Sequence, residues 1–61
     1  MGGVTGYGGA TVNRLYRVYF RGTSNVAANL IAARSPRAAV QIAAAMVNTP
    51  TAYLVAREVL Q

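Results

Sequence analysis

The sequence predicts an α+β fold: a small β-β-α-β domain whose three-stranded, mainly antiparallel sheet has one helix packed on one face. Three observations support this prediction. Aromatic and β-branched residues crowd residues 12–21, which favours a strand. The pair Ser35-Pro36 is typical of a helix start. Residues 52–60 read as a closing strand, in which Tyr53, Val55, Arg57 and Val59 alternate with Leu54, Ala56, Glu58 and Leu60.

Glycine divides the chain into two parts. Residues 1–11 hold five of the six glycines, and such a segment loses much entropy on ordering and has little apolar surface to bury. We predict a flexible Gly-rich N-terminal arm here, with an arm that orders on a neighbouring subunit as the alternative. Residues 12–61 are predicted to form a single small domain.

Alternation along residues 12–21 sorts the side chains onto two faces of the first strand. The set expected in the core comprises Tyr16, Val18 and Phe20. The other set comprises Leu15, Arg17, Tyr19 and Arg21, and we expect Arg17 and Tyr19 to lie on a bare face of the sheet. A helix would instead align Arg14, Arg17 and Arg21, but the aromatic and β-branched content decides for a strand.

Residues 22–25 form a turn cluster, and residues 26–34 after it are the most ambiguous part of the chain. Their alanine content favours a helix, whereas alternation would give a strand with Leu30 facing the core. Pro36 decides for a strand, because the residue before a proline avoids helical geometry and a helix would have to end there.

The helix is predicted over residues 36–47, with Ser35 as its N-cap. One broad apolar arc should face the sheet, namely Ala39, Val40, Ile42, Ala43, Met46 and Val47. Residues 48–51 should end the helix, and residues 52–60 are predicted as a strand, with a last helix as the alternative. The expected core comprises Tyr16, Val18, Phe20, Leu30, Ile42, Ala43, Met46, Val47 and Val55.

The composition excludes most kinds of catalytic and metal-binding site. The chain has six arginines and one acidic side chain, Glu58, with no lysine, histidine, aspartate or cysteine and a formal net charge of +5. General acid–base catalysis usually needs an imidazole or a tuned carboxylate, and metal sites need thiolate, imidazole or carboxylate ligands. We therefore expect no enzyme, no small-molecule substrate, no cofactor and no metal.

The same composition indicates that the domain is stabilised by association. Domains this small are usually reinforced by disulfides, a metal or oligomerisation, and only association remains open to this chain. Residues 1–6 do not resemble a secretory signal, and residues 48–51 interrupt the longest uncharged stretch, so no membrane span is expected. We expect a cytoplasmic or virion-associated protein that is not secreted.

A resemblance to a known group of proteins rests on residues 30–43 and on the closing strand. Ala33-Arg34-Ser35 ends a strand, a helix follows with Ala39 four residues after the serine, and residues 55–59 match the last strand. This pattern resembles that of small β-β-α-β proteins of phages and mobile elements, over about half of the chain. The resemblance implies a β-α-β unit and a phage origin, but no activity and no site residues.

Together these observations predict a non-enzymatic binding or assembly module, a small phage-encoded structural or accessory protein that oligomerises or docks on a larger protein partner. Nucleic-acid binding is the first alternative, because arginine grips phosphate and aromatic rings stack on bases. Inhibition of a host protein is the second alternative. The candidate contact residues for nucleic acid or a partner are Arg14, Arg17, Tyr19 and Arg21.

Overall fold

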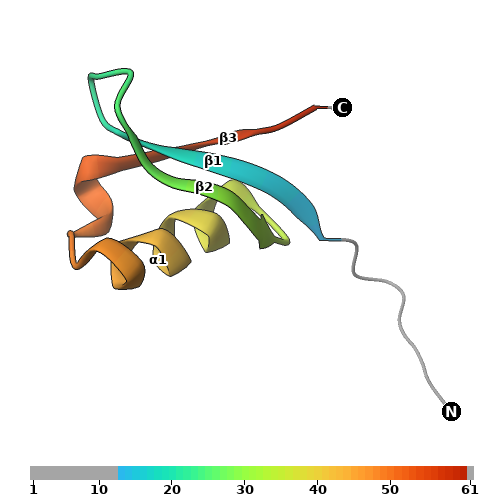
Figure 1. Ribbon diagram of the computed structural model, residues 1–61. Coiled ribbons are helices and arrows are strands. Elements are labelled where there is room, and N and C mark those ends of the chain that lie inside the picture. Colours follow the sequence, from blue (N-terminus) through green and yellow to red (C-terminus); the bar gives the residue numbers. More distant parts are fainter. Residues whose placement is uncertain (1–12, 61) are drawn as a thin grey trace, which may run out of the picture.

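The computed structural model describes residues 13–60, so the predicted arm at residues 1–11 lies outside the described part. The chain order is β1 (Arg14–Phe20), β2 (Val26–Ala33), α1 (Pro36–Val47), a short 3-10 helix η1 (Thr51–Tyr53) and β3 (Leu54–Glu58). Helix α1 covers one face of the sheet (Figure 1). The predicted β-β-α-β order is therefore confirmed, and residues 26–33 and 54–58 are strands rather than helices.

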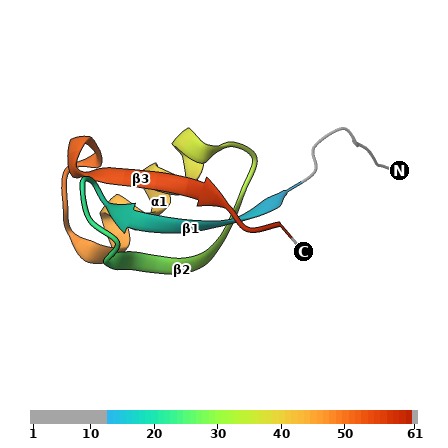
Figure 2. The same ribbon diagram turned by 90° about the horizontal axis from the view of Figure 1, so that it is seen from above.

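The sheet has the order β2-β1-β3, with β1 in the centre and antiparallel to both neighbours. Figure 2 looks onto the sheet face that α1 leaves uncovered, with the helix behind the three strands. The pairing of β1 with β3 is regular from Tyr16↔Glu58 to Phe20↔Leu54. The pairing of β1 with β2 is interrupted by two register shifts.

Helix α1 has the N-cap that the sequence predicts, and it ends where the sequence predicts. Ser35 is extended, and its hydroxyl accepts a hydrogen bond from the Ala38 amide at 3.1 Å. At the other end Asn48 adopts the left-handed conformation with φ 53°, and the Thr49 amide donates to the Ala44 carbonyl. Pro50 follows and cannot continue the helix.

The core lies between α1 and the inner face of the sheet. Its largest fully buried side chains are Tyr16 and Val18 on the central strand, which are 1% and 0% exposed, as predicted. Phe20 packs against this core from the end of β1. The remaining buried residues are Ala28, Ile31, Ala33, Ala39, Ala43 and Leu54.

The prediction that Leu30 faces the core is wrong. Leu30 is 50% exposed and has φ 58°, a left-handed conformation that leucine rarely adopts. The register passes from Tyr16↔Ile31 to Val18↔Ala28, so β2 contains an extra residue and a β-bulge at this point. The bulge breaks the alternation, and Ile31 rather than Leu30 becomes the buried residue.

Ile42 and Met46 were also predicted in the core, and both are exposed, whereas Ala43 is buried and Val47 is half-buried. A three-stranded sheet is narrow, with strands about 4.8 Å apart, so it covers only a narrow stripe of a helix. Small side chains at Ala39 and Ala43 let α1 approach the bulky residues of the sheet closely. The longer residues Ile42 and Met46 therefore lie beyond the margin of the core.

The assignment of Val55 to the core is wrong as well. In β3 it is Leu54 that is buried, opposite Phe20, while Val55 lies opposite Tyr19 on the other side of the sheet. Each alternating set of this strand combines apolar residues with one charged residue, so the pairing with β1 selects which set is buried. Among the described residues no helix is long and apolar enough to cross a membrane.

Candidate functional site

The sheet face opposite α1 carries the residues of β1 that alternate with the buried Tyr16 and Val18, together with their cross-strand neighbours. We call this surface the open face. Its members follow from the strand pairing: Leu15, Arg17, Tyr19, Val26, Ala32, Val55 and Arg57. As predicted, Arg17 and Tyr19 lie on it, at the centre of the sheet.

Two arginines face each other across the open face. Arg17 of β1 and Arg57 of β3 are directly paired, and side chains at such positions have Cβ atoms about 4.5–5.5 Å apart. Like charges in this arrangement destabilise a sheet. The Arg17 Nε donates a hydrogen bond to the Asn29 Oδ1 at 2.8 Å, which orients this guanidinium. An anion between the two guanidinium groups would relieve their repulsion.

The only acidic side chain of the protein is held elsewhere. Glu58 pairs with Tyr16 in the sheet and so belongs to the face opposite Arg17 and Arg57. Its carboxylate lies 3.8 Å from the Arg14 guanidinium, with both side chains partly exposed. Arg17 and Arg57 therefore receive no counter-charge from an acidic side chain of their own chain.

The four predicted contact residues are thus divided into one pair on the open face and two residues held elsewhere. Arg17 and Tyr19 lie together on the open face, while Arg14 lies beside Glu58 on the other side. Arg21 follows β1, and its Nε donates to the Ala52 carbonyl at 2.8 Å. The Arg21 amide also donates to the Tyr53 carbonyl, so Arg21 ties the end of β1 to η1.

Sequence reasoning did not single out Arg57 as a contact residue. Its place beside Arg17 depends on the register between β1 and β3, which no local sequence signal specifies. The only hint in the sequence was that Arg57 shares one face of the predicted strand with Val55 and Val59. The contact between Asn29 and Arg17 was not predictable either, because it depends on the bulge in β2.

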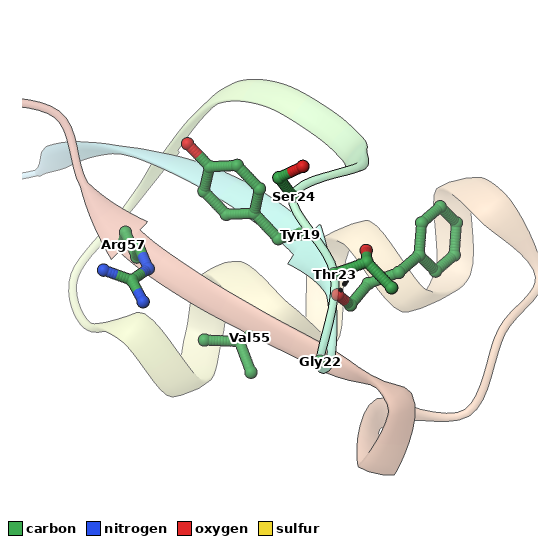
Figure 3. Close-up of a pocket in the computed structure, with 7 residues that line it drawn as sticks. Tyr19, Gly22, Thr23, Ser24, Val55 and Arg57 are labelled. Atoms are coloured by element: carbon green, nitrogen blue, oxygen red, sulfur yellow. Dashed lines mark hydrogen bonds between the residues drawn. The ribbon is translucent and has the colours of Figure 1, made fainter.

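A pocket of about 310 Å³ lies where the open face meets the turn between β1 and β2. Figure 3 shows Tyr19, Val55 and Arg57 on neighbouring strands beside the turn residues Thr23 and Ser24. The pocket therefore combines an aromatic ring, an aliphatic wall, hydroxyl groups and a guanidinium group. Its full lining is Tyr19, Phe20, Gly22, Thr23, Ser24, Val55 and Arg57.

The turn that borders this pocket is held by its own hydrogen bonds. Gly22 has φ 77°, a conformation that glycine adopts without strain. The Thr23 hydroxyl donates to the Phe20 carbonyl at 2.9 Å and accepts from the Asn25 amide at 3.0 Å. In Figure 1 the turn bends away from α1, toward the open side of the sheet, so it forms a raised rim there.

The chemistry offered by these residues is recognition of anions and of flat or apolar groups. Guanidinium groups bind phosphate and carboxylate oxygens in a forked geometry, and a tyrosine ring stacks on planar groups. Within the described part of the chain no three metal-ligating side chains gather in one place. Comparisons of the chain with protein-family models, curated proteins and solved structures found no match.

Proposed function

We propose that this chain is a non-enzymatic binding module that docks through its open face on a larger, negatively charged partner. The observation that carries the proposal is the direct pairing of Arg17 with Arg57 on a face that α1 leaves bare. The fold tolerates an unfavourable charge pair there, which a negatively charged partner would turn into a favourable contact. The phage origin and virion association expected from the sequence stay predictions.

The charge pattern also argues against stacking two copies of the chain through this face. Two symmetric open faces would bring Arg17 and Arg57 of both copies together, and Glu58 of each copy lies on the opposite side. Repulsion between like charges across an interface costs affinity and selects against such a pairing. A partner that supplies negative charge fits this surface better than a second copy.

The test is retention on heparin-agarose, a defined polyanion, in a salt gradient. The double variant Arg17→Gln/Arg57→Gln is compared with Arg34→Gln/Arg37→Gln, which has the same net charge but lacks two exposed arginines near the start of α1. We expect the open-face variant to elute at clearly lower salt than the control variant. If both variants eluted at the same salt concentration, only net charge would determine retention, and the proposal would be contradicted.

A sheet edge favours a second candidate, self-association. Strand β3 is an edge strand with regular pairing to β1, and within the described residues its outer backbone groups meet no other strand. Such an edge is a template for pairing with another chain, whereas the bulges of β2 disturb the opposite edge. Light scattering after size-exclusion chromatography tests this candidate: a defined oligomer supports it, and a monomer across the concentration range excludes it.

A further inference from the structure

The open face is more than a cluster of positive charge, because its central strand also carries an aromatic ring. Tyr19 is flanked by Val26 of β2 and Val55 of β3, its direct cross-strand partners. Its ring is half-buried and lines the pocket beside the turn. A flat aromatic group bordered by two short aliphatic side chains forms a platform on which a planar group can stack.

Charged and polar groups surround this platform on two sides. Arg57 lies on the same strand as Val55 and lines the pocket, as does Ser24 from the turn (Figure 3). Among the described residues neither the Arg57 guanidinium nor the Ser24 hydroxyl has a hydrogen-bond partner. A ligand in this pocket would therefore meet, within reach of the ring, donors that no other described residue engages.

The neighbouring guanidinium of Arg17 extends the positive surface along the central strand. Its Nε is engaged by Asn29, and no hydrogen bond to another described residue engages its two terminal nitrogens, which can make a forked contact with an anion. Tyr19 and Arg17 are separated by one residue of β1, so they share a face about 7 Å apart along the strand. The surface thus places a ring that can stack on a base beside guanidinium groups that can bind the flanking phosphates.

We infer that the open face binds single-stranded nucleic acid, with one base stacked on Tyr19 in the pocket and flanking phosphates held by Arg57 and Arg17. This inference rests on the proposed docking function and names the class of partner. A duplex keeps its bases stacked inside, so it would meet the arginines but not the ring. An acidic protein would likewise leave the ring and its aliphatic border without a planar counterpart. A face of this size accommodates on the order of two or three nucleotides.

The experiment measures fluorescence anisotropy of a fluorescein-labelled oligo-dT of about twelve nucleotides, within the common range of single-strand site sizes. The full chain is titrated at several salt concentrations, with a duplex of equal length and poly-glutamate as competitors. Tyr19→Leu removes the ring, Tyr19→Phe keeps it, and Tyr53→Leu is the matched control, since Tyr53 is exposed but does not line the pocket. Circular dichroism verifies folding, and Tyr19→Thr, which keeps strand propensity, replaces Tyr19→Leu if that variant is unfolded.

We expect Tyr19→Leu to weaken oligo-dT binding about tenfold or more, and Tyr19→Phe to remain within about twofold of the unaltered chain. Tyr53→Leu should bind as the unaltered chain does. Each lost phosphate contact should reduce the salt dependence by about 0.7 in the log–log slope, so Arg17→Gln/Arg57→Gln should lower it by about 1.4.

Two results would overturn the inference and leave anionic docking intact. The first is a Tyr19→Leu variant that binds oligo-dT like the unaltered chain while Arg17→Gln/Arg57→Gln binds weakly. The second is poly-glutamate or the duplex competing as well as unlabelled oligo-dT, which would identify an acidic protein or double-stranded partner. If the double arginine variant binds every polyanion like the unaltered chain, the inference and the proposed function both fail.

Discussion

The two faces of this small sheet come from the same three strands but have opposite character. The covered face carries Tyr16 and Val18, which are almost fully buried beneath the alanines of α1. The open face carries Arg17 and Tyr19 from alternate positions of the same central strand. Both faces contain a tyrosine, so the difference lies in what surrounds each ring: α1 on one side, and arginines and valines on the other.

This contrast separates stability from binding along a single strand. Burial beneath the helix provides most of the hydrophobic stabilisation, at about 25 cal/mol per Å² of apolar surface. The open face adds a pair of like charges that opposes folding, and its apolar residues remain partly exposed. Substitutions on the covered face of β1 should therefore reduce stability, whereas substitutions on its open face should mainly reduce binding. The following predictions test that difference.

The largest effect should come from the two tyrosines of β1. Tyr16→Ala removes a ring that is 1% exposed, and we expect it to lower the free energy of unfolding by about 3–5 kcal/mol. A domain of this size has little more stability than that, so the variant should be unfolded at room temperature. Tyr19→Ala should lower it by about 2 kcal/mol or less, the contribution of its two cross-strand pairs with Val26 and Val55. Urea denaturation followed by circular dichroism measures both, and equal losses would contradict the assignment of the faces.

A smaller effect should come from the bulge in β2. Leu30 has φ 58° and a half-exposed side chain, so Leu30→Gly removes an unfavourable backbone conformation with little loss of burial. We expect the free energy of unfolding to rise by about 0.5–1 kcal/mol. Ala32→Gly, an exposed position of the same strand, should lower it by about 0.5–1 kcal/mol. A loss of stability in both variants would mean that the Leu30 side chain stabilises the fold.

The smallest effect concerns the paired arginines. Arg57→Glu replaces repulsion with attraction opposite Arg17, and we expect it to raise the free energy of unfolding by about 0.2–1 kcal/mol. The gain should shrink as salt screens the exposed charges. The same variant should lose retention on heparin, so stability and binding would change in opposite directions. If the variant were less stable and still retained on heparin, the proposed role of this charge pair in binding would be contradicted.

Helix α1 and strand β1 could be predicted because each has a local signal, whereas β2 was assigned only indirectly, through Pro36, and η1 was not predicted. Ser35-Pro36 starts α1, Asn48 to Pro50 end it, and aromatic alternation marks β1. Which side chains of each strand face the core was harder to predict, since this depends on long-range strand pairing. The left-handed Leu30 shifts the alternation of β2, and leucine carries no signal for that conformation.

The candidate site was predictable only where it lies on the central strand. Arg17 and Tyr19 follow from the alternation around Tyr16 and Val18. Arg57 and Val55 required the register between β1 and β3, because each alternating set of β3 combines apolar residues with one charged residue. Arg14 and Arg21 share the sequence spacing of a basic cluster, yet an ion pair and a backbone contact hold them apart from it.

The most direct test of the contrast between the two faces is a methyl NMR titration of the full chain with oligo-dT. Val55 on the open face and Val18 on the covered face are residues of the same type on adjacent strands, so each serves as the other's control. We predict that the methyl resonances of Val55 and Leu15 shift with added oligo-dT, while those of Val18 and Leu54 do not. Shifts confined to Ile42 and Met46, the exposed apolar residues of α1, would contradict this account.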